Sequence, residues 1–268
     1  MLLTPVVAGS VVPLRDEDAL PPKRAPRGGA LDREQEKLLS NLQELGAALY
    51  AESRRALLVV LQARDAGGKD GTIRKVFGAL NPQNLRLTDF GAPSREELAH
   101  DFLWRVHRAV PPFGRVGVFN RSHYEDVLVA RVRGLVPEEV WSRRYAQINA
   151  FERILVENGV TILKFFLHIS RDEQKERLRK RLHDPAKNWK FQEGDLEDRL
   201  LWDDYTAAYQ EVLRRCSTPH APWYVVPADK KPVRNLLVAK VVVDTLRRMS
   251  PAHPPAEPEV LRLLEEIV

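Results

Sequence analysis

The sequence predicts an α/β protein built on one parallel β-sheet with helices on both faces. Short β-rich apolar runs alternate with helical patterns through the central part of the chain, and this alternation is typical of parallel βαβ crossovers. The run at 56–61 is a continuous stretch of Leu and Val after Ala56, as expected for a strand buried on both faces. A glycine-rich segment follows this run directly, at the carboxyl end of the strand, where such folds bind ligands.

Periodicity and capping residues place the individual elements. Two helices are expected to begin at Ser94 and Ser170, because each serine is followed three residues later by a glutamate, Glu97 and Glu173. The other elements follow from apolar runs and helical spacing. Strands are expected at 56–61, 84–90, 115–119, 160–169 and 223–226, and helices at 31–53, 71–80, 137–158 and 233–248.

Proline marks the two ends of the folded unit. Of the 19 prolines, five lie before residue 31 and four lie after residue 250, and proline opposes both helices and central strands. We therefore expect an extended N-terminal arm at 1–30, one folded domain at 31–250 and a C-terminal arm at 251–268. The C-terminal arm is expected to finish in a short amphipathic helix at 257–268, with Leu261, Leu264 and Ile267 on one face.

Composition limits the class of protein. The 268 residues include 42 Lys and Arg against 37 Asp and Glu, which gives a net charge of +5, and 44% are hydrophobic. These values are typical of a soluble globular protein, and no apolar run approaches the roughly 18 residues of a membrane span. The N-terminus lacks the basic region of a signal peptide, and the single cysteine, Cys216, suggests a reducing compartment. We expect a cytoplasmic protein with no membrane association.

The segment after the first strand has the composition of a phosphate-binding loop. Residues 62–72 read QARDAGGKDGT, and glycines allow successive backbone N–H groups to point at one anion at the start of a helix. The match to G-x-x-x-x-G-K-[ST] is incomplete, because Ala63 replaces the first glycine and Asp70 replaces the Ser or Thr. An ordinary βα turn with an exposed lysine is the alternative. We expect phosphate contacts from Ala66, Gly67, Gly68, Lys69, Asp70 and Gly71.

Asp65 lies inside the same loop. A carboxylate beside a phosphate site is repulsive unless a divalent cation lies between them. Asp65 is therefore a predicted ligand of Mg²⁺, with Mn²⁺ as a possible substitute.

A second polar cluster follows the third predicted strand, where residues 120–126 read NRSHYED. P-loop enzymes often have a metal-directing acid at this position. Here we expect Asn120 to be the second metal ligand, and Asn120 and Glu125 to contact the nucleotide. Arg121 is the predicted clamp for a phosphoryl group. A hydrolase is not indicated by Ser122 and His123, because the chain has no G-x-S-x-G motif.

A strongly basic segment follows the fourth predicted strand. Residues 171–190 contain eight Lys or Arg and four acids. Arg177 and Arg181 are four residues apart and share a helix face, and Lys187 and Lys190 follow. P-loop nucleotide kinases have a mobile lid whose arginines close over the transferring phosphate. We expect such a lid at 171–195; a solvated charged face is the alternative.

These three ordered motifs resemble those of the polyphosphate kinase 2 family. The resemblance covers about 31–249 and rests on DAGGKDG at 65–71, NRSHYED at 120–126 and D-P-x-K-x-W-K at 184–190. It implies a P-loop kinase-like three-layer αβα fold with a five-stranded parallel sheet and a helical lid. It also implies a polyphosphate:nucleotide phosphotransferase that uses Mg²⁺ to transfer phosphate from inorganic polyphosphate to AMP or ADP, and a homo-oligomer. Family members commonly have Asp at the position of Asn120, and Asn there with Glu125 nearby resembles the class III subgroup, which phosphorylates both AMP and ADP towards ATP.

The charge of polyphosphate then suggests how the site is built. Polyphosphate carries about one negative charge per phosphate, so its channel should be lined by Lys and Arg, with carboxylates only where metal binds. The terminal phosphate oxygen of the nucleotide can attack in line, with no covalent enzyme intermediate. The predicted catalytic residues are Asp65, Lys69, Arg121, Arg177 and Arg181. Beyond the loop, the predicted polyphosphate contacts are Lys75, Arg131, Lys187 and Lys190.

Two other functions are compatible with parts of this pattern. The first is an ATP-dependent nucleoside monophosphate kinase, although such enzymes usually keep the Ser or Thr that Asp70 replaces here. The second is a non-catalytic protein that binds polyanions or nucleic acid. The modest net charge of +5 and the lack of any recognition module argue against nucleic acid as a partner. The scattered histidines have no ligand spacing, so no zinc is expected.

Overall fold

The Leu and Val run that begins at Ala56 forms the central strand of a parallel sheet. A computed structural model describes residues 3–257, 259 and 260, and every residue of β1 (Ala56–Ala63) in it is buried. This strand pairs in parallel with β3 (Val116–Asn120) on one side and β4 (Val160–His168) on the other. The edges are β2 (Leu85–Asp89) and β5 (Trp223–Pro227), which gives the order β2-β3-β1-β4-β5. All five predicted strands are present, and the pairing is parallel as expected.

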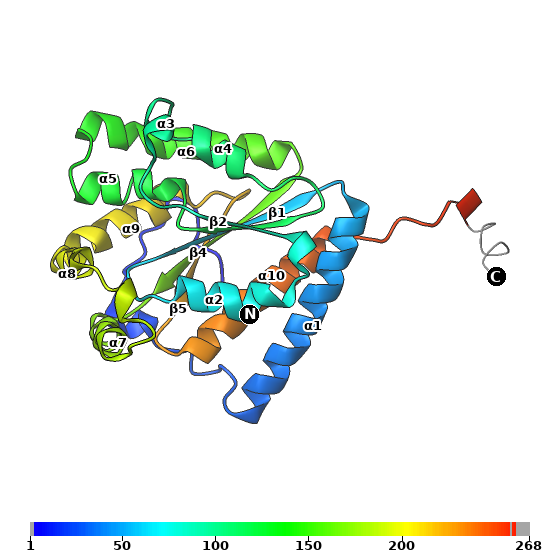
Figure 1. Ribbon diagram of the computed structural model, residues 1–268, viewed down its shortest axis with the longest axis horizontal. Coiled ribbons are helices and arrows are strands. Elements are labelled where there is room, and N and C mark those ends of the chain that lie inside the picture. Colours follow the sequence, from blue (N-terminus) through cyan, green and yellow to red (C-terminus); the bar gives the residue numbers. More distant parts are fainter. Residues whose placement is uncertain (1–2, 258, 261–268) are drawn as a thin grey trace.

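Helices cover both faces of this sheet (Figure 1). Leu57, Val59 and Leu61 of β1 pack into one apolar core, whereas Leu58 and Val60 pack into the other. The first core lies under α1 (Gly29–Glu52), α2 (Lys69–Val76) and α10 (Lys231–Met249). The second lies under α4 (Trp104–Ala109), α6 (Glu138–Glu157) and α9 (Trp202–Cys216). The predicted three-layer αβα fold is therefore confirmed.

Several predicted helices differ from the expectation in length. The helix at Ser94 has the expected capping box, but α3 covers only Arg95–Leu98. Ser170 Oγ accepts from the backbone N–H of Glu173 at 3.2 Å and so caps α7 (Arg171–His183). The predicted helix at 71–80 is divided into α2 and the short helix η2 (Phe77–Ala79). Several helices were not predicted: η1 (Asp16–Ala19), η3 (Pro82–Asn84), α4, η4 (His123–Asp126), α5 (Val129–Val132), η5 (Asn188–Lys190), α8 (Glu193–Leu200) and the longer α9.

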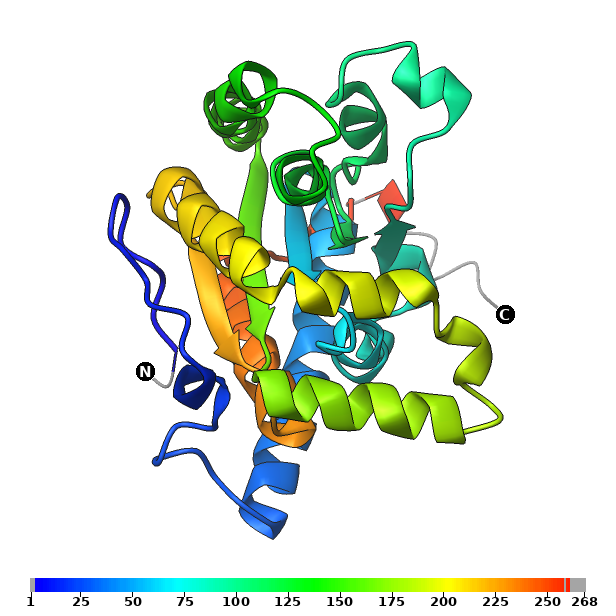
Figure 2. The same ribbon diagram turned by 90° about the vertical axis from the view of Figure 1, so that its left-hand side faces the viewer.

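The basic segment after β4 leaves the body of the sheet and returns to it (Figure 2). α7 leads outward, η5 makes the turn, and α8 and α9 lead back. Arg199 of α8 ties the two limbs together, because its Nη1 donates to the carbonyl of Arg171 at 2.8 Å and to Gln174 Oε1 at 2.9 Å. Most of this excursion coincides with the segment expected to be a lid.

The N-terminal segment is extended and packs against the β5 side of the sheet. The N–H of Val6 donates to the carbonyl of Trp223 at 2.8 Å, and His168 Nε2 donates to the carbonyl of Arg15 at 2.8 Å. Asp16 Oδ1 accepts from the N–H of Arg171 at 3.2 Å, which joins this arm to the first residue of the lid.

At the other terminus the chain leaves the body after Met249 (Figure 1). Residues 259 and 260 are helical; Leu261, Leu264 and Ile267, on which the predicted terminal helix depended, lie outside the described residues. No helix among the residues that the structure describes is long and apolar enough to cross a membrane.

Candidate active site

The glycine-rich segment forms a tight loop between β1 and α2, at the carboxyl end of the central strand. Gly68 caps α2 with a φ of 102°, and Ala66 has a φ of 58°. A Cβ on Gly68 would lie 1.9 Å from Arg234 Nη1, and a Cβ on Gly67 would lie 2.6 Å from the Cβ of Ala63. Both positions therefore require glycine, because neither has space for a Cβ and because Gly68 also has a left-handed backbone conformation. The loop ends at the N-terminus of α2, a geometry that favours anions.

Two buried arginines hold this loop from behind. Arg177 Nη1 donates to the carbonyls of Ala66 at 3.0 Å and Gly67 at 3.3 Å, and its Nη2 donates to the carbonyl of Ala228 at 2.6 Å. Arg234 Nη1 donates to the same carbonyl of Gly67 at 3.3 Å. These bonds use carbonyl groups of the loop; among its N–H groups, that of Gly67 donates to the carbonyl of Arg64 at 3.0 Å.

The position of Arg177 differs from the expected one. Sequence spacing placed it with Arg181 over a transferring phosphate, but Arg177 is only 9% exposed and its donors bind backbone carbonyls and Glu173. The i,i+4 spacing indicates a shared helix face, but the face of α7 at Arg177 is turned toward the loop. In this structure Arg177 supports the phosphate-binding loop from behind.

Three predicted catalytic side chains meet in front of the loop. Arg121 Nη2 lies 3.4 Å from Asp65 Oδ1, and Lys69 Nζ donates to the carbonyl of Ala63 at 3.3 Å. Burial lowers the pKa of Lys69, the nearby charge of Arg121 lowers it further, and Asp65 partly opposes both. Arg121 has a φ of 62°, so the chain turns sharply as it leaves β3. The motifs after β1 and β3 are brought together because the two strands are neighbours in the sheet.

Asp65 and Arg121 line a small cavity of about 50 Å³. Glu125 reaches it from η4, and burial raises the pKa of this carboxyl group against the opposing charges of Arg121 and Lys69. Tyr205 and Tyr209 of α9 form another wall, and Gln174 Nε2 donates to the carbonyl of Asp65 at 3.1 Å. The cavity is lined by Ala63, Arg64, Asp65, Arg121, Glu125, Leu128, Val129, Gln174, Asp198, Tyr205 and Tyr209.

Asn120 has an oxygen that suits a divalent cation. Its Nδ2 donates to Asp70 Oδ1 at 3.3 Å, whereas its Oδ1 is buried and has no hydrogen-bond partner. A buried amide oxygen without a partner is unfavourable unless another group satisfies it, and Mg²⁺ prefers such oxygen ligands. Within the described part of the chain, no three or more His, Cys, Asp or Glu side chains cluster as a metal site. A cation bound here would therefore take most of its ligands from phosphate and water.

The far end of the expected lid reaches the loop through one ion pair. Lys190 Nζ lies 3.2 Å from Asp70 Oδ2, and burial of Asp70, which would raise its pKa, is outweighed by Lys190 and Asn120, so that the pKa is lowered. Arg181 pairs with Asp195 at 3.1 Å, and Lys187 pairs with Asp184, so both stay within the lid. Of the predicted lid cations, Arg177 and Lys190 therefore contact the phosphate-binding loop, Arg177 through backbone carbonyls and Lys190 through Asp70.

The two remaining predicted contacts lie elsewhere. Lys75 is exposed on the last turn of α2. The guanidinium of Arg131 lies 4.7 Å from the centre of the Trp141 ring and donates to the hydroxyl of Tyr145 at 3.4 Å, so it packs on α6 and does not line the cavity.

Sequence reasoning missed two arginines that shape the site. Arg64 lies inside the recognised loop, and its guanidinium stacks on Trp202 at 3.9 Å and donates to the carbonyl of Trp202 at 3.3 Å. This contact joins the loop to the first turn of α9. The sequence around Arg64 did contain a signal, because arginine is unusual in a buried strand end. Arg234 had no such signal, because it lies 166 positions from Gly68 and only the fold brings them together.

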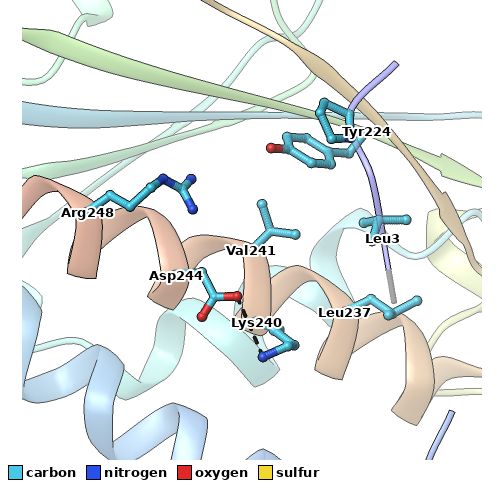
Figure 3. Close-up of a pocket in the computed structure, with 8 residues that line it drawn as sticks. Leu3, Tyr224, Leu237, Lys240, Val241, Asp244 and Arg248 are labelled. Carbon is cyan, nitrogen blue, oxygen red and sulfur yellow. Dashed lines mark ion pairs between the residues drawn. The ribbon is translucent and has the colours of Figure 1, made fainter. Parts of the chain in front are cut away.

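A larger cavity, of about 230 Å³, lies away from these motifs (Figure 3). Leu3, Tyr224, Leu237 and Val241 make its walls apolar, and Lys240 pairs with Asp244 at its edge at 3.6 Å. Tyr224 lies on the edge strand β5, in register with Phe165 of β4, which pairs in turn with Leu61 of β1. The charged side chains of the motifs after β1 and β3, Asp65, Arg121 and Glu125, line the smaller cavity and not this one.

Together these features define a P-loop phosphotransferase: a strand–glycine loop–helix unit with a lysine at the helix start, a second motif on the neighbouring strand, and a helical excursion where a lid is expected. Comparison with known proteins identifies the family: the model of Polyphosphate kinase 2 matches residues 29–254. The chain belongs to the polyphosphate kinase 2 family.

Individual relatives agree with this assignment over most of the chain. The chain is 57% identical over 219 residues to an AMP/ADP-polyphosphate phosphotransferase of Meiothermus ruber, covering 82% of this chain and 81% of that protein. It is 44% identical over 252 residues to an ADP-polyphosphate phosphotransferase of Rhodopseudomonas palustris, covering 88% and 86%. The crystal structure of polyphosphate kinase 2 from Arthrobacter aurescens TC1 superposes with a TM-score of 0.86 at 43% identity, covering 93% and 92%.

Proposed function

We propose that this protein transfers phosphate from inorganic polyphosphate to AMP and ADP, in the direction of ATP. The observation that carries the proposal is the meeting of Lys69, Arg121 and Asp65 in front of a glycine loop at a helix N-terminus. The name of the relative at 57% identity supports AMP and ADP as acceptors, and the name of the relative at 44% identity supports ADP. Family membership supports polyphosphate as the donor.

The chemistry assigned to these residues is positioning and charge stabilisation. The loop N–H groups and Lys69 bind the phosphates of one substrate, and Arg121, whose guanidinium can form two parallel hydrogen bonds, binds the phosphoryl group between donor and acceptor. An acceptor phosphate oxygen attacks in line and the shortened polyphosphate leaves. Because the transition state is loose, most of the rate enhancement comes from holding the reactants and from the fixed positive charges.

Asp65 and Asn120 are the residues we assign to Mg²⁺. Asp65 brings charge, and Asn120 brings an oxygen that has no other partner. When bound, Mg²⁺ neutralises phosphate charge and orients the oxygens around the reacting phosphorus. Asn in place of the common Asp lowers the negative charge at this position, so the metal relies more on Asp65 and on the phosphates.

Lys190, Arg181 and Lys187 are assigned to closure of the lid over polyphosphate. Their carboxylate partners, Asp70, Asp195 and Asp184, all belong to the protein. A polyanion entering the site can replace Asp70 and Asp184, because the ion pairs of Lys190 and Lys187 are the more exposed ones and such pairs contribute little free energy. The pair of Arg181 with Asp195 is more buried.

We also assign the active form to a homo-oligomer, which sedimentation velocity of the purified protein can test.

The direct test compares polyphosphate and ATP as phosphate donors, each with its nucleotide acceptor. Polyphosphate with AMP or ADP and Mg²⁺ should yield ATP, measured by luciferase, whereas ATP with AMP should yield little ADP. ATP-dependent phosphorylation of AMP without use of polyphosphate would instead assign a nucleoside monophosphate kinase. Binding of polyphosphate or nucleic acid without any turnover would assign a polyanion-binding protein.

A further inference from the structure

Four polar side chains are buried beneath the second motif, in a region that the proposed chemistry does not use. His123 and Tyr124 come from η4, Glu152 from α6 and Lys164 from the middle of β4. None is more than 1% exposed. We refer to them as the buried quartet.

The hydrogen bonds of the buried quartet are nearly complete. Lys164 Nζ donates to Glu152 Oε2 at 2.5 Å, to the hydroxyl of Tyr124 at 2.9 Å and to the carbonyl of Cys216 at 2.7 Å, which uses all three of its N–H groups. Glu152 Oε1 accepts from the hydroxyl of Tyr124 at 2.8 Å and from His123 Nε2 at 3.2 Å. Burial alone would raise the pKa of Glu152, but Lys164 and His123 outweigh it and lower the pKa.

A buried group of charged side chains contributes little net stability. The free energy needed to remove two charges from water is about as large as the free energy gained from their attraction, and apolar residues of similar size often stabilise a core as well or better. A satisfied polar network, however, has few alternative arrangements and fixes the geometry of the elements it joins. The buried quartet therefore fixes the relative positions of η4, α6 and β4.

The buried quartet fixes two walls of the candidate active site. In η4, His123 and Tyr124 point into the network, whereas Glu125, the next residue, lines the cavity together with Arg121. The other wall is α9, whose last residue is Cys216 and whose first turns contribute Tyr205 to the cavity. Lys164 therefore connects the far end of α9 to the turn that carries Arg121 and Glu125.

Ser122 links this arrangement to the central strand. Its Oγ accepts from the N–H of Tyr124 at 3.2 Å and from Gln62 Nε2 at 3.1 Å. The N–H of Arg121 donates to the carbonyl of Leu61 at 3.1 Å. The turn is thus held to β1 on one side and to the buried quartet on the other, and little freedom is left to Arg121 between them.

We propose that Tyr124, Glu152 and Lys164 are positioning residues for phosphoryl transfer, which hold Arg121 and Glu125 against the phosphate-binding loop. This inference rests on the proposed function. A small displacement of a charged group raises the free energy of the transition state more than it weakens substrate binding. Misplacement by about 1 Å can lower the rate about 100-fold. The loss should therefore appear in kcat and not in KM.

Tyr124→Phe is the informative variant, because it removes one oxygen and leaves the ring in the core. We expect kcat for ATP formation from polyphosphate and ADP to fall about tenfold or more, with both KM values within about twofold of wild type. Tyr224→Phe is the matched control, because it removes the same hydroxyl from a buried tyrosine on the edge strand β5, which lines the other cavity and not the candidate active site. Its kcat should equal that of wild type. Glu152→Gln, which keeps the side-chain shape, should repeat the kcat loss and serves as the second variant if Tyr124→Phe does not fold.

A double-mutant cycle separates positioning from general weakening of the fold. If Tyr124 acts through Arg121, Tyr124→Phe should cost little further activity in an Arg121→Ala background, because its effect is already lost. Equal fold-losses in both backgrounds would overturn the proposal, as would a folded Tyr124→Phe protein with the kcat of wild type or with a change in KM alone. A wild-type protein that makes no ATP from polyphosphate would instead refute the proposed function.

Discussion

Lys190 Nζ of the lid lies 3.2 Å from Asp70 Oδ2 at the start of α2, and this ion pair joins residues 120 positions apart. Both side chains are largely exposed, at 44% and 66%. An exposed pair contributes at most about 1 kcal/mol. The base of α7, by contrast, is held to the loop by the hydrogen bonds of Gln174 and Arg177. If the segment acts as a lid, we expect polyphosphate to replace the Lys190–Asp70 pair, while the base of α7 stays in place.

Lys190→Ala should weaken polyphosphate binding more than it weakens the chemistry. We expect the KM for polyphosphate to rise several-fold, the KM for ADP to stay unchanged, and the melting temperature to shift little, because an exposed pair is lost. Steady-state kinetics with varied polyphosphate checks this. Lys175→Ala, which removes an exposed lysine from the same lid, is the control, and an equal effect of both variants would mean that only total lid charge matters.

Gly68→Ala should disable the phosphate-binding loop. The new Cβ would lie 1.9 Å from Arg234 Nη1, and φ at this position is 102°, so strain of about 1–3 kcal/mol and a displaced loop are expected. We expect kcat/KM to fall at least about 100-fold. Gly78→Ala is the matched control, since nothing lies within 4 Å of the added Cβ and φ is not positive. Comparable activity of the two variants would contradict the loop geometry described here.

Arg177 and Arg181 should behave differently, although they are one helical turn apart. Arg177→Ala leaves several buried carbonyls without donors and should lower the free energy of unfolding by about 2–4 kcal/mol. Arg181→Ala breaks one partly buried ion pair with Asp195 and should cost less than Arg177→Ala, because only one partner is lost. Urea denaturation followed by circular dichroism measures both. If Arg177→Ala retains wild-type stability, its side chain does not support the loop as described.

Lys69→Ala and Asp65→Ala should each lower kcat by at least about 100-fold, the usual scale for one group that stabilises transition-state charge. Lys37→Ala, an exposed lysine on α1, is the control for loss of positive charge alone. The effect of Asp65→Ala should shrink as Mg²⁺ is raised if the variant binds metal more weakly. A correctly folded Asp65→Ala protein with near-wild-type turnover at all Mg²⁺ concentrations would exclude Asp65 as a metal ligand.

The sheet could be predicted from sequence because its strands are short, continuous apolar runs separated by clear helical patterns. The return limb of the lid could not. α9 has Trp202, Tyr205 and Tyr209 on its buried face, but no helix was predicted there. Helices of four to six residues such as α4 and α5 are too short for periodicity to reveal.

The candidate site was predictable where its residues are adjacent in sequence. Residues 65–71 and 120–126 each form one wall, and parallel pairing brings their strands together. The direction in which Arg177 points was not predictable, because spacing shows which residues share a helix face but not what that face contacts. Arg234 and Lys164 were missed for a related reason: each acts across the fold on a segment far away in sequence.

We propose that the phosphate-binding loop and the lid bind polyphosphate as the phosphate donor. The most direct measurement is the rate of ATP formation by the purified protein with Mg²⁺, polyphosphate and either ADP or AMP, beside a parallel reaction of ATP with AMP. We predict ATP from both nucleotides only when polyphosphate is present, loss of this activity in Lys69→Ala, and little phosphorylation of AMP by ATP. Phosphorylation of AMP by ATP at a comparable or higher rate, with no ATP formed from polyphosphate, would contradict this account.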